Sequence, residues 1–199
     1  PVRAEKLSYE GPFGVGYGVC LYHMDAGPIP DPYVRLARRS LEYYLEHQDF
    51  LPVPEDLPEE LYSRRAGAFV SLKEDGELRG CIGTISPVCN NLAEEIIGNA
   101  VSAGFYDPRF KPVRKEEKDR LVYSVDVLGE PEPVAGENEL DASRYGVIVS
   151  NSGRRGLLLP DLEGVDTPAL QIAIARRKAG IGEEEPVSLS RFEVVRHRE

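Results

Sequence analysis

Apolar residues recur at helical spacing in three stretches of the chain, and each stretch predicts an amphipathic helix. The first follows Asp31-Pro32, which reads as an N-cap with proline in the first turn, and it ends near Gln48. The second begins after Asn91, whose spacing to Glu94 resembles a capping box. The third opens at Thr167-Pro168 and closes before Gly180.

Apolar runs of strand length separate these helices. Two pairs of runs flank turn-forming residues: Asp75-Gly76 in one case and residues 151–154 in the other, so each pair predicts a hairpin. Hairpins with intervening helices, instead of regular βαβ units, predict an α+β fold with a mostly antiparallel sheet and flanking helices. The predicted strands are residues 68–72, 78–85, 121–128, 145–150, 156–159 and 187–195.

Turn formers and prolines suggest where the chain divides. Residues 27–32 read GPIPDP, which places a boundary near Ile29 and separates an amino-terminal segment, residues 1–28, from a domain at residues 29–199. Pro52, Pro54 and Pro58 oppose a helix, so residues 50–60 are expected to form a surface connection.

Composition narrows the class of protein. The net charge of −10, from 34 acidic and 24 basic residues, disfavours nucleic acid as a partner. The apolar runs are far shorter than the roughly 20 residues that span a bilayer, and no secretory leader is evident, so no membrane role and a cytoplasmic location are expected. The three cysteines include no Cys-x-x-Cys pair, and neither a disulfide framework, a metal site nor a cofactor is predicted.

The segment Leu78-Arg79-Gly80-Cys81-Ile82-Gly83 is the main candidate for chemistry. The period-two rule places Arg79 on the same strand face as Cys81, where its guanidinium would favour the thiolate. The two glycines would leave the backbone accessible to a ligand. Alternatively, Cys81 is a small buried residue and the glycines serve close helix packing. The residues alone leave both interpretations open.

A second candidate lies on the turn Asp107-Pro108-Arg109-Phe110. A carboxylate and a guanidinium beside an aromatic ring would suit an anionic or planar ligand. The same residues could instead end a helix with a local ion pair. A cysteine nucleophile usually needs a base, and none of the three histidines, at positions 23, 47 and 197, is near Cys81 in sequence.

Residues 30–196 resemble the AMMECR family, also known as protein A of the AmmeMemoRadiSam system. The matching blocks are Phe69–Leu72 leading into LRGCIGT, then Asp107–Phe110, Ser124–Leu128, Gly156–Pro160 and Arg177–Gly180. The resemblance implies a larger lobe that contains both chain ends, a smaller lobe, and a cleft between them. It also implies a shared pathway with Memo-like proteins, which resemble class III extradiol dioxygenases, and with radical SAM proteins. It carries over no reaction.

The segment Ser8–Tyr17 resembles the end of such a dioxygenase-like domain, so residues 1–28 are interpreted as a remnant or linker from a longer fusion. Two hypotheses follow for the AMMECR domain. In the first, it is an accessory module that binds a small molecule or a partner protein. In the second, it is an enzyme in which Cys81 is the nucleophile. The predicted binding surface comprises Leu78, Arg79, Gly80, Ile82, Gly83, Thr84, Asp107 and Arg109.

Overall fold

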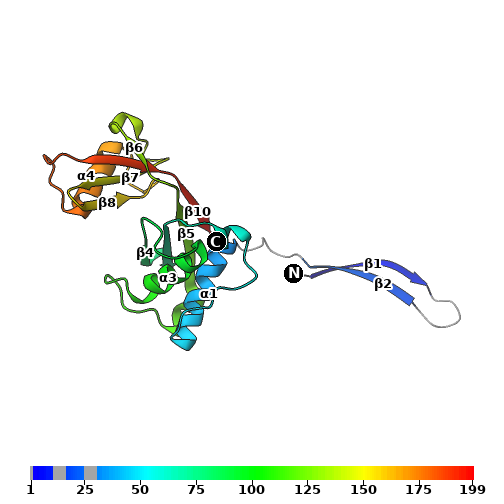
Figure 1. Ribbon diagram of the computed structural model, residues 1–199. Coiled ribbons are helices and arrows are strands. Elements are labelled where there is room, and N and C mark those ends of the chain that lie inside the picture. Colours follow the sequence, from blue (N-terminus) through cyan, green and yellow to red (C-terminus); the bar gives the residue numbers. More distant parts are fainter. Residues whose placement is uncertain (1, 11–16, 25–30) are drawn as a thin grey trace. The chain divides into compact units, whose positions relative to one another are not determined.

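The computed structural model describes residues 2–10, 17–24 and 31–199 (Figure 1). The chain forms two compact units, Pro1–Pro30 and Asp31–Glu199. In the first unit, β1 (Val2–Glu10) pairs antiparallel with β2 (Tyr17–Met24). The sequence pattern did not predict these two strands. The boundary predicted near Ile29, and residues 11–16 of the segment that resembles a dioxygenase-like domain, lie outside the described residues.

The three predicted helices are present in residues 31–199, and their caps are as expected. Helix α1 (Pro32–His47) begins at Asp31, whose carboxylate accepts a hydrogen bond from the Tyr33 amide at 2.9 Å. Helix α3 (Leu92–Phe105) is capped by Asn91, and α4 (Pro168–Ala179) ends at Gly180 in the left-handed conformation. A short helix, α2 (Glu59–Ser63), follows the proline-rich connection and was not predicted.

The larger sheet has four antiparallel strands in the order β10-β5-β3-β4. Strands β3 (Ala68–Glu74) and β4 (Glu77–Gly83) form the first predicted hairpin, with positive φ angles at both Asp75 and Gly76. Strand β5 (Leu121–Leu128) lies between β3 and β10 (Val194–Arg198). Helices α1 and α3 cover one face of this sheet and enclose the main core (Figure 1).

The smaller sheet also has four antiparallel strands, in the order β6-β9-β7-β8, with α4 packed on β7 and β8. Its strands are β6 (Glu132–Val134), β7 (Gly146–Asn151), β8 (Arg154–Leu158) and β9 (Ser188–Phe192). The single strand predicted at residues 187–195 is therefore wrong. It divides into β9 and β10, which belong to different sheets. Two neighbouring chain segments pass from one sheet to the other: β5 leads into β6, and β9 leads into β10. Between the sheets, the Gly129 amide of the first segment donates to the Glu193 carbonyl of the second at 2.8 Å.

The helix-free faces of the two sheets meet in a small apolar core. Leu128 of the larger sheet joins Ile148, Leu157 and Phe192 of the smaller sheet in this buried cluster. Both Asp31 and Glu199 belong to the larger lobe, where Asp31 bonds His197 and Glu199 bonds Arg38. The structure thus confirms the predicted α+β class with antiparallel sheets and flanking helices.

The two sheets repeat one topology. In each, a hairpin leads to a helix and then to a strand that pairs with the first strand of the hairpin: β3-β4-α3-β5 and β7-β8-α4-β9. In each, the helix packs against a glycine of the second hairpin strand. A Cβ on Gly80 would lie 2.1 Å from the Ala103 carbonyl oxygen, and one on Gly156 would lie 2.0 Å from that of Ala175. Only glycine fits at either position.

Candidate functional site

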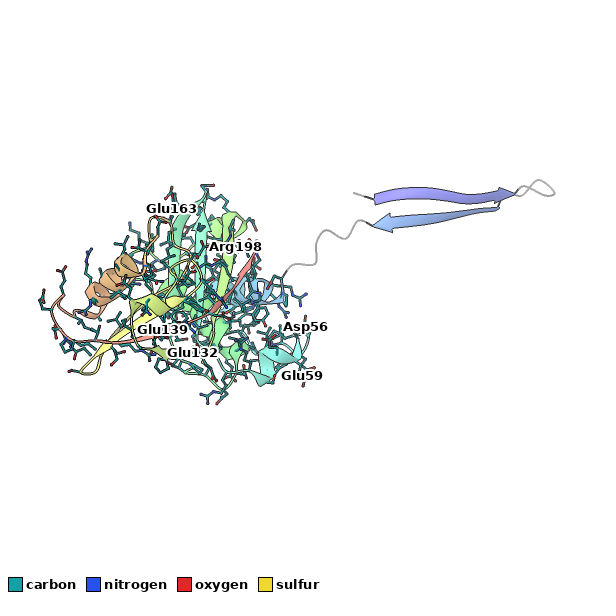
Figure 2. The ribbon with its side chains drawn as sticks, turned by 90° about the horizontal axis from the view of Figure 1, so that it is seen from above. Asp56, Glu59, Glu132, Glu139, Glu163 and Arg198 are labelled. Carbon is teal, nitrogen blue, oxygen red and sulfur yellow. The ribbon has the colours of Figure 1, made fainter. Side chains whose placement is uncertain are left out.

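A groove of about 570 Å³ lies between the helix-free face of the larger sheet and the segment that follows β8. Its volume falls within the roughly 300–1,000 Å³ range of small-molecule sites. Figure 2 labels one residue from each side, Arg198 on β10 and Glu163 before α4. The lining residues are Ser71, Lys73, Leu78, Cys81, Arg109, Val122, Tyr123, Ser124, Asp126, Leu159, Asp161, Leu162, Glu163, Arg196, Arg198 and Glu199.

A row of polar residues crosses the floor of this groove. Cys81 on β4 is directly opposite Ser71 on β3, which is opposite Ser124 on β5, which is opposite Arg198 on β10. The Ser71 hydroxyl donates a hydrogen bond to the Cys81 sulfur at 3.2 Å. One row therefore presents a thiol, two hydroxyls and a guanidinium on the same face of four strands.

The prediction that Arg79 and Cys81 share one face of the strand is wrong, because β4 contains a β-bulge at Arg79. The register shifts so that Gly80 is opposite Leu72 while Leu78 is opposite Lys73. The bulge reverses the alternation, and Leu78 joins Cys81 in the groove. Arg79 is absent from the groove lining, and its Nε donates to Glu117 Oε1 at 2.8 Å instead.

The guanidinium beside Cys81 belongs to Arg109. Its Nη2 donates to the Cys81 carbonyl at 3.2 Å, and its Nε and Nη2 bond the two oxygens of Asp107 at 2.9 and 2.7 Å. Asp107 is buried and also accepts the Cys81 amide at 2.9 Å. The hydrogen bonds from the Arg109 guanidinium, together with those from the Cys81 and Arg109 backbone amides, hold the pKa of the Asp107 carboxyl well below its usual range. Asp107 thus fixes β4 to the turn and orients Arg109 into the groove.

The remaining residues of the predicted surface support the fold outside the groove. Gly80 contacts α3, and Ile82 packs against the main core. A Cβ on Gly83 would collide with the Phe69 ring. The Thr84 hydroxyl bonds the buried Glu95 carboxylate, which also accepts the Val88 and Cys89 amides at 2.9 Å each. Of the predicted surface residues, the groove contains Leu78 and Arg109, and it brings them together with Cys81, the predicted nucleophile.

The groove provides no evident base for the thiol. His197 lies on the opposite face of the sheet, stacked on Tyr33 at 3.8 Å and bonded to Asp31 at 2.7 Å. His47 is exposed at the end of α1. Within residues 31–199, no histidine, aspartate or glutamate is hydrogen-bonded to the Cys81 sulfur. The arrangement can bind polar groups, but it does not form a thiol–base pair.

Sequence reasoning missed most of the groove, including Ser71, Lys73, Ser124 and Arg198. Their common signal is their register across four strands, which appears only once the pairing is known. Among the described residues, no three histidine, cysteine, aspartate or glutamate side chains are grouped to hold a metal ion. In the same residues, no helix has the length and apolar character required to cross a bilayer.

Comparison with known proteins identifies the family. The model of the AMMECR1 family matches residues 34–197. The chain belongs to the AMMECR1 family. The crystal structure of the uncharacterized protein PH0010 from Pyrococcus horikoshii shares the fold, with a TM-score of 0.76 and 34% identity over 82% of this chain and 88% of that one.

Two bacterial relatives differ in length. A Thermotoga maritima protein is 53% identical over 84% of this chain and 97% of its own length. Protein CA_C1420 of Clostridium acetobutylicum is 46% identical over 99% of this chain, but the chain spans only 46% of that protein. This AMMECR1 protein therefore corresponds to about half of the Clostridium relative, and the match includes the amino-terminal unit.

Proposed function

We propose that this AMMECR1 protein is an accessory binding module whose groove beside Cys81 holds a small molecule. The observation that carries the proposal is the row formed by Cys81, Ser71, Ser124 and Arg198 on the groove floor. Polar side chains on a sheet face that lies between two lobes supply hydrogen bonds without contributing to a core. Binding of this kind needs no base beside the thiol, which agrees with the surroundings of Cys81.

The partners expected from the family resemblance are a Memo-like dioxygenase-like domain and a radical SAM protein. The Clostridium relative supports a fusion, because this chain matches less than half of its length. In this proposal the module works in the cytoplasm and delivers or retains a small molecule for such partners. Nucleic acid and membrane are not among the proposed partners.

A metabolite-capture experiment tests the proposal. The full chain is incubated with a metabolite extract and analysed by native mass spectrometry, beside Ser124→Trp, which fills the groove. Ser188→Trp is the matched control, because Ser188 is an exposed strand residue outside the groove lining. We expect wild type and Ser188→Trp to retain the same small molecule and Ser124→Trp to lose it. Identical capture by all three proteins would contradict the proposal.

A cysteine-dependent enzyme is the alternative, and the position of the Cys81 sulfur in the groove is the observation that favours it. Cys81→Ser distinguishes the two functions in the same assay. A binding module retains its ligand after this substitution. An enzyme retains unconverted substrate but loses any thioester, thioether or other covalent adduct on Cys81.

Alkylation kinetics test whether this thiol is accessible. Burial, together with the nearby Glu95 carboxylate, raises the pKa of the Cys89 thiol, so we expect iodoacetamide to label Cys81 faster than Cys89 near neutral pH. Because Arg79 bonds Glu117, Arg79→Ala should leave the Cys81 rate unchanged, whereas Arg109→Ala should alter it. Site-resolved mass spectrometry measures both rates. A Cys81 that resists labelling in the folded protein would exclude the enzyme.

A further inference from the structure

The two walls of the groove differ in charge. On the sheet wall, the basic side chains are Lys73, Arg109, Arg196 and Arg198. The opposite wall, formed by residues that follow β8, contributes Asp161 and Glu163 and no basic residue. A groove with unlike walls favours a ligand whose two ends carry opposite charge.

Existing ion pairs account for only part of this charge. Arg196 is neutralised by Asp126, whose oxygens lie 2.7 and 3.3 Å from its Nε and Nη2. Asp126 is buried, so this pair is part of the groove wall. The sheet-wall acid Glu199 is held by Arg38 at 2.7 Å. These pairs leave little capacity for a ligand.

Other charges are available to a ligand. Within residues 31–199, neither Lys73 nor Arg198 has a carboxylate within ion-pairing distance, and Glu163 has no basic partner. Asp161 lies 3.8 Å from Arg196 and remains largely exposed. The available cations are thus on one wall and the available anions on the other.

Aliphatic side chains line the same groove. Leu78 and Val122 belong to the sheet wall, and Leu159 and Leu162 belong to the opposite wall. Leu78 and Val122 are exposed despite their size. Such side chains give an apolar chain of carbon atoms a favourable contact while its charged ends reach the polar groups.

We propose that the groove binds a small zwitterion: a molecule with a carboxylate or phosphate at one end, an amine at the other, and an aliphatic stretch between them. This assignment rests on the proposed function and names its ligand class. The anionic end bonds Arg198 and the Ser124 hydroxyl. The ammonium end faces Glu163 and Asp161. The aliphatic stretch contacts Leu78 and Leu162.

Titration with unbranched ω-amino acids of four, six and eight carbons tests the assignment. The matched probes are unbranched carboxylates and amines of the same lengths. Binding to the full chain is followed by the backbone amide shifts of the groove strands in NMR spectra. We expect at least one ω-amino acid to bind roughly tenfold more tightly than its matched carboxylate or amine, which is the effect of about one extra charge-assisted contact.

Two substitutions assign the two ends. Glu163→Gln should remove the advantage of the ω-amino acid over the carboxylate while leaving carboxylate binding unchanged. Arg198→Gln should weaken both. Glu184→Gln is the control for the change of charge, because Glu184 is exposed and lies outside the groove lining. It should leave every affinity unchanged.

The failure of this inference is distinguishable from failure of the proposed function. Carboxylates that bind as tightly as ω-amino acids at every length would overturn the zwitterion and retain the groove as a binding site. An ω-amino acid preference that survives Glu163→Gln would overturn the placement of the ammonium end at Glu163. Absence of any shift with all probes would also overturn the zwitterion. The proposed function fails only if metabolite capture is unaffected by Ser124→Trp.

Discussion

The two hairpin–helix–strand units of the protein, β3-β4-α3-β5 and β7-β8-α4-β9, differ first in one pair of facing residues. Beside the glycine that contacts the helix, the first unit pairs Ser71 with Cys81, and the second pairs Ile148 with Leu157. Ile148 and Leu157 are 2% and 7% exposed and belong to the apolar core between the sheets. Ser71 and Cys81 are only partly buried and line the groove.

Comparing these two residue pairs shows which side chains the fold itself requires. The same topology builds an apolar core when these positions hold Ile148 and Leu157, so the backbone itself does not require polar residues there. A thiol and a hydroxyl on that face contribute less to stability than aliphatic side chains would. Ser71 and Cys81 therefore fit the binding role that we propose for the groove.

The bulge is the second difference between the units. In the second unit the turn glycine, Gly153, is three residues before Gly156, whereas in the first unit Gly76 is four residues before Gly80. The extra residue is Arg79, at which the register shifts. It rotates Leu78 to the face of Cys81 and thereby extends the groove floor.

Exchanging the two pairs should produce the largest effect. Ile148→Ser with Leu157→Cys should lower the free energy of unfolding by roughly 4 kcal/mol or more, because it removes buried apolar volume and buries a hydroxyl. The reciprocal Ser71→Ile with Cys81→Leu should change it by less than about 1 kcal/mol, since these positions face the groove. Urea titration measures both.

If the first exchange prevents folding, Ile148→Val alone should still cost about 0.5–1.5 kcal/mol. A large destabilisation by Ser71→Ile with Cys81→Leu would show that these residues are part of a core. The difference between the units would then be one of packing.

The two glycine contacts should respond alike. Gly80→Ala and Gly156→Ala each force a methyl group against a helix carbonyl, and each should cost roughly 3 kcal/mol through overpacking. Gly98→Ala is the control in α3, where a Cβ would contact nothing. It should raise stability by roughly 0.5–1 kcal/mol through helix propensity. Unequal costs at Gly80 and Gly156 would contradict the structural equivalence of the two units.

Asp107 holds Arg109 and the Cys81 amide beside the groove, and its removal should have a smaller, pH-dependent effect. Asp107→Asn should cost roughly 1–2 kcal/mol near neutral pH, because the Cys81 amide loses a charged acceptor and Arg109 is partly screened by solvent. The folded-state pKa of Asp107 is depressed. Its contribution is therefore present above the unfolded pKa of about 3.9 and is lost as the pH falls toward the folded value.

Urea titrations of wild type and Asp107→Asn between neutral pH and acid should show this difference shrinking below about pH 4. Asp119→Asn, at an exposed residue, should show no difference at any pH. A constant cost for Asp107→Asn across the series would mean that the carboxylate charge contributes nothing.

Local sequence signals predicted the three long helices and the turn of the first hairpin, because the causes of these features are local. Asp31, Asn91 and Thr167 cap helices through hydrogen bonds that span two or three residues, and all three are at the predicted starts. The Asp75-Gly76 turn likewise depends on backbone conformations at two residues. These signals need no knowledge of the tertiary fold.

The period-two rule failed at Arg79 because two distant constraints act on one strand. The turn pairs Lys73 with Leu78, while the close approach of α3 requires Gly80 opposite Leu72. One residue too many lies between these contacts and forms the bulge. The interruption at Glu193 between β9 and β10 has a similar cause. There the chain passes from one sheet to the other beside Gly129, which lies between β5 and β6 and bonds Glu193. Neither constraint is visible within a few residues of sequence.

The path of the chain between the sheets has a consequence for biosynthesis. The smaller sheet uses one continuous stretch, residues 132–192, whereas the larger sheet combines residues 68–128 with β10 at residues 194–198. During translation, the smaller lobe is therefore fully synthesised before β10 leaves the ribosome. Arg198 reaches the groove floor only with that last strand. Until then the ribosome carries a nascent chain whose smaller lobe can already be folded while the proposed ligand site is still incomplete.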